Sequence, residues 1–282
     1  MRFDPIIQVE NDGLKLPEPV GVWSERKYSL MGGYCEIFNK GIKNLFSNRV
    51  YIDLFAGAGF AAIKKKNKIL KSSSLIALSI PTLFTKYILC EKDIEKMDAL
   101  KKRIHREFPD KDVIFVSGDS NENVQLVINE IRKLGPSTIS FCFVDPFSLN
   151  LHFDTIKRIA NVGRVDFLIL LALMMGAKRN FHNYITERSK VVELFIDKPD
   201  WREPFKNREI RKEEFINYIA KTYDENMYKL GYKIKSEGLK PKVDAEEYRL
   251  ALYYLAFYSK HDLGNKFFKE IQKYHIEQQT LF

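Results

Sequence analysis

Two glycines placed two residues apart follow an apolar run and a carboxylate early in the chain. Residues 50–52 are Val-Tyr-Ile, and Asp53, Phe55, Gly57 and Gly59 come soon after them. Such a run is typical of a buried parallel strand that ends in a tight turn, where glycine lets a ligand approach the backbone. The free N–H groups of a helix after such a turn favour polar or anionic ligand groups. The pattern therefore predicts a nucleotide-like cofactor over the carboxyl end of this strand.

Acidic residues also close three later apolar runs. The runs are 86–90, 113–116 and 139–144, and the acids that follow them are Glu91, Asp119 and Asp145. Because the carboxyl ends of parallel strands meet at one edge of a sheet, we expect these acids to lie there together with Asp53. One acid at a strand end is usually a helix cap or a surface residue, whereas four in register predict a site.

The acids favour S-adenosylmethionine over a dinucleotide as the cofactor. Residues 57–62 formally match the dinucleotide fingerprint, but Glu91 lies much further from Asp53 than the roughly 20 residues expected in that pattern. Asp53 would also repel a pyrophosphate. S-adenosylmethionine has a positive charge and an amino acid end, so we expect Asp53 to attract its ammonium group. Glu91 is then expected to accept from both ribose hydroxyls, and Asp119 from the adenine amine.

Strand-like and helix-like segments alternate along much of the chain. Amphipathic segments with helix start and stop signals lie between the apolar runs, and residues 165–173 form a fifth run. This alternation predicts an α/β fold with a mostly parallel sheet covered on both faces. Residues 178–242 are expected to form a helical insertion or cap within a single domain spanning 1–282. Residues 232–234 and 248–259 are expected to add two strands.

Several stretches resemble known families. Residues 53–59 resemble the glycine-rich first motif of class I S-adenosylmethionine-dependent methyltransferases, and Glu91 resembles their ribose-binding acid. More closely, residues 51–59, 143–147 and 252–261 are similar to the three-Cys-motif partner protein (TcmP) family. The resemblance implies a Rossmann-like methyltransferase sheet of seven strands with the last strand antiparallel. It also implies a protein partner encoded nearby.

The chain departs from the family pattern at two places. Ala58 stands where the family usually has proline, and residues 72–75 read Ser-Ser-Ser-Leu instead of Gly-Ser-Pro-Leu. The second departure leaves the loop before the following helix less constrained.

Asp145, Pro146 and Phe147 form the candidate catalytic segment. The segment resembles the Asp/Asn-Pro-Pro-aromatic segment that ends the fourth strand of amino-methyltransferases of nucleic-acid bases, although the second proline is missing. In those enzymes the acid and the proline carbonyl accept hydrogen bonds from an exocyclic amine, and the aromatic ring stacks on the base. The same roles are expected here, on a base flipped out of its duplex. The alternative is an ordinary turn between a strand and a loop.

Cofactor contacts are expected from residues around the strand ends. The resemblance also places Lys27 at the methionine carboxylate, because related enzymes have an upstream basic-aromatic segment there. The alternative for this segment is an N-terminal helix that only packs on the core. The expected cofactor-binding residues are Lys27, Asp53, Phe55, Ala56, Gly57, Gly59, Glu91, Asp119 and Ser120.

Lysines are concentrated directly after the glycine turn. Five lysines and no acid occur between Phe60 and Lys71. They predict either a phosphate-contacting lip at the mouth of the site or a solvated flexible loop. Lys178 and Arg179 follow the fifth apolar run, where they face substrate phosphates or only begin a solvated helix. The expected substrate-binding residues are Lys64, Lys65, Lys66, Lys178 and Arg179.

The composition limits the partners and the compartment. The net charge of +9 favours a polyanionic partner. The apolar run 167–175 is about half the roughly 20 residues that a membrane span needs, and no segment has the pattern of a signal peptide. Cys35, Cys90 and Cys142 have no paired spacing, and no cluster has metal-ligand spacing, so no metal is expected. These features fit the cytoplasm.

The residues favour an S-adenosylmethionine-dependent methyltransferase that modifies an exocyclic amino group of a base in DNA or RNA. Catalysis is then expected to be mainly positioning and electrostatics. The alternative from another class is a non-catalytic, methyltransferase-like partner subunit of a nucleic-acid-processing or defence complex. A third alternative is a small-molecule methyltransferase, whose substrate affinity would hardly depend on salt.

Overall fold

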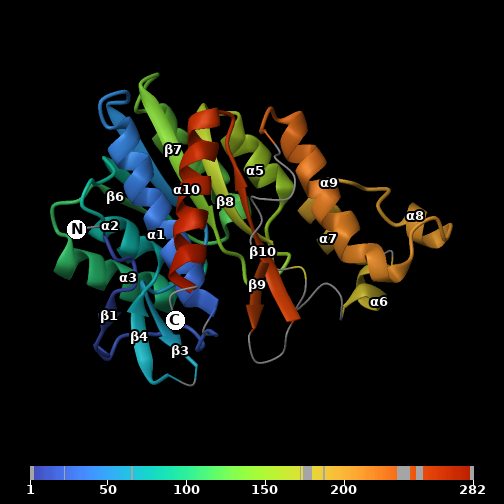
Figure 1. Ribbon diagram of the computed structural model, residues 1–282, viewed down its shortest axis with the longest axis horizontal. Coiled ribbons are helices and arrows are strands. Elements are labelled where there is room, and N and C mark those ends of the chain that lie inside the picture. Colours follow the sequence, from blue (N-terminus) through green and yellow to red (C-terminus); the bar gives the residue numbers. More distant parts are fainter. Residues whose placement is uncertain are drawn as a thin grey trace.

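The computed structural model describes residues 3–21, 23–64, 66–171, 173, 180–186, 188–233, 242–245 and 250–279. Its strands are β1 (Gln8–Val9), β2 (Asn48–Asp53), β3 (Phe60–Ile63), β4 (Lys68–Lys71), β5 (Lys86–Glu91), β6 (Val113–Ser117), β7 (Thr138–Val144), β8 (Arg164–Leu171), β9 (Lys242–Ala245) and β10 (Leu250–Tyr258). Its α-helices are α1 (Trp23–Ile42), α2 (Ser73–Ser79), α3 (Ile94–Glu107), α4 (Ser120–Arg132), α5 (Phe153–Ala160), α6 (Phe181–Tyr184), α7 (Val191–Ile196), α8 (Glu203–Lys206), α9 (Phe215–Lys229) and α10 (Asp262–Gln279). Figure 1 shows the large sheet as a central layer with helices on both sides.

The central sheet has seven strands within the described residues, in the order β6-β5-β2-β7-β8-β10-β9. The first five of these strands are parallel to one another, and β10 runs antiparallel to both β8 and β9. The predictions of an α/β fold and of a mostly parallel sheet with its last strand antiparallel are therefore confirmed. The chain moves outward from β2 in one direction to β5 and β6, then in the other direction to β7 and β8. Ligands of open α/β sheets bind at the carboxyl ends of the strands beside such a reversal.

Alternate residues of the central strands face opposite layers of helices. In β7, Cys142 and Val144 pack with residues of α4, α5, α7 and α9, whereas Phe141 and Phe143 pack with residues of α1, α2, α3 and α10. A strand that is buried on both faces needs apolar residues at every position. This is why continuous apolar runs in the sequence identify these strands.

A small antiparallel sheet separates the glycine turn from the next helix. β3 and β4 form a hairpin, and β1 pairs with β4. Helix α2 begins only after Ser72, whose backbone N–H donates to the carbonyl of Gly59 with an N···O distance of 2.7 Å. The described lysines after the turn therefore lie in or beside this hairpin.

The strand predicted over residues 232–234 is wrong at its described positions. Tyr232 and Lys233 lie outside any strand, and Ile234 falls outside the described residues. Tyr232 is buried because its ring packs on Phe167 and its hydroxyl donates to the carbonyl of Val165, so its apolar character reflects packing on the sheet. The outer neighbour of β10 is instead β9, in a more polar stretch. Helices α6 to α9 occupy the chain between β8 and β9.

A buried carboxyl on β8 gives a testable pH dependence of stability. Burial raises the pKa of Asp166 to about 6, although the hydroxyls of Ser259 and Tyr34 donate to it, the latter at 2.7 Å. The unfolded value is about 3.9. The folded chain therefore binds the extra proton between about pH 4 and pH 6. Protonation of Asp166 therefore contributes about 3 kcal/mol to the free energy of unfolding below pH 4, and this contribution is lost as the pH rises to 6.

We expect Asp166→Asn to flatten the pH dependence of the free energy of unfolding between pH 4 and pH 6, by the equivalent of about one proton. Urea unfolding of the wild type and the variant across this range checks the slope. Asp98→Asn, at an exposed position of α3, is the control and should leave the slope unchanged. Equal slopes in the wild type and Asp166→Asn would contradict the assignment.

The described residues contain no helix that is long and apolar enough to cross a membrane. Cys35, Cys90 and Cys142 are all free and buried. Within the same residues, no group of three or more His, Cys, Asp or Glu side chains could hold a metal ion.

Candidate functional site

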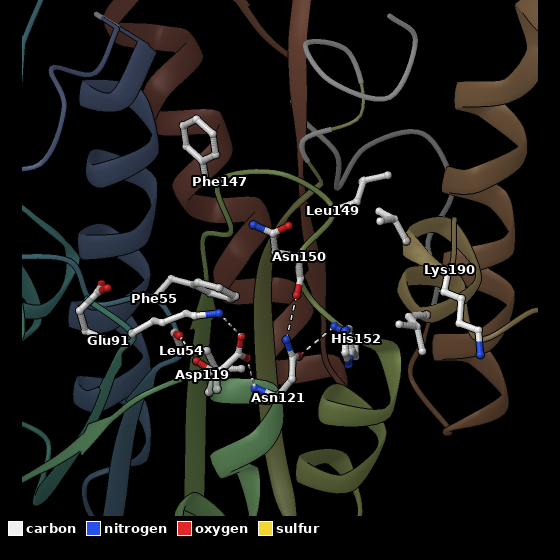
Figure 2. Close-up of a pocket in the computed structure, with 14 residues that line it drawn as sticks. Leu54, Phe55, Glu91, Asp119, Asn121, Phe147, Leu149, Asn150, His152 and Lys190 are labelled. Atoms are coloured by element: carbon white, nitrogen blue, oxygen red, sulfur yellow. Dashed lines mark hydrogen bonds and ion pairs between the residues drawn. The ribbon is translucent and has the colours of Figure 1, made fainter. Parts of the chain in front are cut away.

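A cavity of about 480 Å³ lies at the carboxyl edge of the central sheet. Its walls come from the turn after β2, the ends of β5 and β6, the loop after β7 and the start of α7. Figure 2 shows Glu91 on one side, Lys190 on the other and Phe147 above them. The volume lies within the range of roughly 300–1,000 Å³ that is usual for small-molecule sites. The cavity is where the strand-end acids were predicted to meet.

The glycine turn after β2 uses conformations that only glycine adopts without strain. Gly57 has φ +64° and Gly59 has φ +88°. A Cβ on Gly57 would meet nothing within 4 Å, whereas a Cβ on Gly59 would lie 3.0 Å from a methyl of Leu100 and 3.2 Å from a methyl of Leu75. Gly57 therefore leaves space for a ligand, and Gly59 allows the turn to pack on α2 and α3.

Alanine at the two glycines should separate these roles. We expect Gly59→Ala to lower the free energy of unfolding by about 2–3 kcal/mol, because it adds crowding to a left-handed backbone. Gly57→Ala should lower it by only about 1 kcal/mol, because its Cβ meets open space. Urea unfolding measures both values. A loss for Gly57→Ala equal to that for Gly59→Ala would contradict the assignment.

Glu91 connects the end of β5 to the glycine turn. Its Oε2 accepts from the backbone N–H of Gly57 at 2.8 Å, and its Oε1 accepts from the N–H of Asp93 at 2.8 Å. The side chain also lines the cavity. Each carboxylate oxygen can accept more than one hydrogen bond, so Glu91 can hold the turn and still bind ligand hydroxyls.

Asp119 and Ser120 line the cavity where β6 ends and α4 begins. Burial alone would raise the pKa of Asp119, but the N–H of Asn121 and the ammonium of Lys92, 3.0 Å away, hold that pKa below its usual value. The buried hydroxyl of Ser120 donates to the carbonyl of Leu54 and so joins this corner to the turn after β2. Asp119 is thus ionised at neutral pH, with its carboxylate at the cavity.

Asp53 lies behind the glycine turn instead of in the cavity. Its side chain is fully buried, and it accepts from the hydroxyls of Tyr51 and Ser74 at 3.1 and 3.2 Å and from the N–H of Phe55 at 3.2 Å. Burial raises its pKa to about 6. Asp53 was expected to attract a ligand ammonium directly. Its buried position shows that it supports the turn instead. The alternation along β2 is the reason, since it directs Asp53 and Tyr51 to the same side of the sheet.

The candidate catalytic segment follows β7. Asp145 forms an ion pair with Lys27 of α1, and the exposed fractions of the two side chains are 19% and 7%. Pro146 is buried, while Phe147 is 96% exposed and lines the cavity. The structure therefore joins Lys27 to the candidate catalytic acid. It also leaves an aromatic face uncovered beside the cavity.

The predicted lysine contacts are only partly described. Lys64 is exposed, and Lys66 pairs with Glu25 of α1 at 3.2 Å; neither lysine lines the cavity. Lys65, Lys178 and Arg179 fall outside the described residues. Contact of these lysines with a substrate stays a prediction.

The sequence reasoning missed three sets of residues at this site. Arg103 is fully buried and donates to the carbonyl of Ala58 in the glycine turn at 2.7 Å, while also binding Asp12. Asn121 donates to the carbonyl of Asn150 at 2.8 Å and so ties together the loops after β6 and β7 (Figure 2). The start of α7 closes one wall. Asn121 directly follows the predicted site residues Asp119 and Ser120, so its place in the sequence could have identified it. Nothing in the local sequence of α7 or around Arg103 indicated a place at the site.

Comparison with known proteins gives remote structural similarities. No family model and no curated protein matches the chain. Trm1 from Pyrococcus horikoshii, solved with S-adenosyl-L-methionine, has 14% identity over 92% of this chain and 63% of that chain, with a TM-score of 0.42. TYW2 from M. jannaschii, solved with AdoMet, has 12% identity over 92% and 88%, with a TM-score of 0.43. An O-methyltransferase from Bacillus cereus, solved with SAH, has 11% identity over 81% and 80%, with a TM-score of 0.44.

Proposed function

We propose that this chain is an S-adenosylmethionine-dependent methyltransferase whose acceptor is an exocyclic amino group of a nucleic-acid base. The observation that carries the proposal is the cavity that brings together the turn after β2, Glu91 and Asp119 at three neighbouring strand ends.

The side chains of the cavity fit the polar groups of this cofactor. Glu91 presents acceptor oxygens beside the turn, suited to a ribose diol. Asp119 presents an ionised carboxylate one strand further out, suited to an adenine amine. Gly57 leaves open space above the turn for the amino acid end. When bound, S-adenosylmethionine supplies an electrophilic methyl group on a sulfonium.

The segment after β7 would position the acceptor. Asp145 accepts a hydrogen bond from the amino group, which turns the nitrogen lone pair toward the methyl group, and the Pro146 carbonyl accepts the second. The exposed ring of Phe147 stacks on the base. Transfer would form the new C–N bond as the methyl–sulfur bond breaks and its electron pair stays on sulfur, leaving S-adenosylhomocysteine, and the nitrogen would release one proton to solvent. Positioning of this kind supplies much of the rate enhancement when two reactants are held in line.

Two features support a nucleic acid as the carrier of the amine. The net charge of +9 suits a polyanion. An exposed aromatic ring is also a stacking surface for a base that has left its helix. Lys64, Lys65, Lys66, Lys178 and Arg179 would contact phosphates. The ion pair with Lys27 occupies one oxygen of Asp145, the candidate catalytic acid. This observation favours a second candidate function, that of a non-catalytic partner subunit of a nucleic-acid complex.

Transfer of a labelled methyl group tests the proposal. The protein is incubated with methyl-labelled S-adenosylmethionine and separate pools of DNA, tRNA and protein, at low and high salt. We expect label in a nucleic-acid pool, with less transfer as salt rises because phosphate contacts weaken. Label only in protein would contradict the nucleic-acid assignment. Cofactor binding without transfer to any pool would favour the partner-subunit function.

A further inference from the structure

A nearly buried ion pair occupies the carboxyl end of β7. Lys27 Nζ contacts Asp145 Oδ2, and the exposed fractions of the two side chains are only 7% and 19%. The Lys27 ammonium also lies 4.9 Å from the centre of the Tyr28 ring. In the described part of the chain no hydrogen bond reaches the other carboxylate oxygen, Oδ1, of Asp145.

The pair lies beside the point where the strand order reverses. β7 is the neighbour of β2 on the side opposite β5, and Asp145 directly follows its last residue. This is the crevice in which open α/β sheets bind their ligands. The carboxyl of Asp53 is buried, and it accepts from the hydroxyls of Tyr51 and Ser74 and from the N–H of Phe55. Among the described residues, Lys27 and Asp145 therefore set the local charge where β7 ends.

An ion pair in such a position is not explained by stability. Removing two charges from water costs as much as their attraction returns, and apolar replacements of buried pairs are often neutral or stabilising. A lone Asp145 would add a negative charge where β7 ends and would attract cations to that point. With Lys27 in contact, the net charge of the pair is zero, while Oδ1 can still accept a hydrogen bond.

We infer that Lys27 is a positioning residue that selects the class of acceptor amine. The site takes a neutral aromatic amine, such as the exocyclic amino group of adenine or cytosine, and rejects an alkylammonium group. A neutral N–H donates to Asp145 Oδ1 without approaching another positive charge. An alkylammonium at the same place meets the Lys27 ammonium, and like charges in contact at a desolvated site weaken binding strongly. The inference rests on the proposed function and deepens it, and it reassigns Lys27 from the cofactor carboxylate to Asp145.

The test compares the binding of neutral and cationic probes to charge variants. Cytidine, adenosine and n-butylammonium are titrated into the protein and followed by NMR chemical shifts, with and without saturating S-adenosylhomocysteine. Lys27→Met removes the charge, and Lys27→Arg keeps it. Lys86→Met is the matched control. Lys86 also has little exposure and pairs with an aspartate, Asp112, but it lies at the amino end of β5, away from the carboxyl edge of the sheet.

We expect the wild type, Lys27→Arg and Lys86→Met to bind the better nucleoside at least about tenfold more tightly than butylammonium. Lys27→Met should shift this ratio about tenfold toward the cation. The inference is overturned if the wild type prefers butylammonium or if no probe binds. It is also overturned if Lys27→Met changes the ratio of nucleoside affinity to butylammonium affinity by less than about twofold. Failure of S-adenosylhomocysteine to bind overturns the proposed function instead, and the titrations without it still decide the role of Lys27.

Discussion

Replacing Asp145 with alanine is expected to lower the rate of methyl transfer by about 100- to 1,000-fold while cofactor affinity changes by less than about threefold. The carboxylate is the only charged acceptor in the segment after β7, and in the proposed function it orients the amine lone pair toward the methyl group. Losing one preorganised polar contact in an active site has effects of this size. Single-turnover transfer assays measure the rate, and calorimetry with S-adenosylhomocysteine measures the affinity.

The design must separate catalysis from stability, because Asp145→Ala leaves Lys27 nearly buried without its carboxylate partner. Removal of one member of a buried pair destabilises a protein by about 3–5 kcal/mol. The double variant Lys27→Met with Asp145→Ala removes both charges and should recover stability without recovering transfer. Transfer at the wild-type rate in either variant would contradict the role of Asp145.

Replacing Glu91 with glutamine is expected to weaken cofactor binding by about 10- to 100-fold. The two carboxylate oxygens each accept a backbone N–H, from Gly57 and from Asp93, and the Glu91 side chain lines the cavity. A glutamine side chain has only one acceptor oxygen, so it cannot hold both N–H groups and two ribose hydroxyls. A hydrogen bond to a charged group contributes about 1.5–3 kcal/mol. Calorimetric titration with S-adenosylmethionine gives the affinity.

Glu95→Gln is the matched control for this change. Glu95 makes an ion pair with Lys15, and its side chain is 72% exposed, away from the cavity. The control removes the same charge from the same region and should leave cofactor affinity unchanged. Equal affinities for the wild type and Glu91→Gln would remove Glu91 from the cofactor site.

The parallel strands could be predicted because both of their faces are covered by helices, although the edge strand β6 is only partly buried. Residues 86–90, 113–116 and 139–144 each fall within a strand whose side chains pack on helices from two sides. The strand expected at Tyr232 failed because a single aromatic residue that packs on a sheet has the same local pattern as a short strand. The hairpin of β3 and β4 was missed because each strand has only four residues and the lysines of β4 give the segment the composition of a polar loop, although β3 itself is apolar and mostly buried.

The acids at the site could be predicted, but their partners could not. A strand-end position places Glu91 and Asp119 at the cavity whatever lies elsewhere in the chain. The contact between Lys27 and Asp145 joins residues 118 positions apart, and that between Arg103 and Asp12 joins residues 91 positions apart. Such contacts depend on how α1 and α3 pack on the sheet, which no local pattern encodes.

The central claim is that the carboxyl edge of the sheet binds S-adenosylmethionine. Calorimetric titration of the wild type with S-adenosylmethionine and S-adenosylhomocysteine tests it most directly, with Glu91→Gln titrated in parallel. We expect one binding site per chain for both ligands in the wild type, and binding that is about 10- to 100-fold weaker in Glu91→Gln. Absence of binding of both ligands to the folded wild-type protein would contradict it.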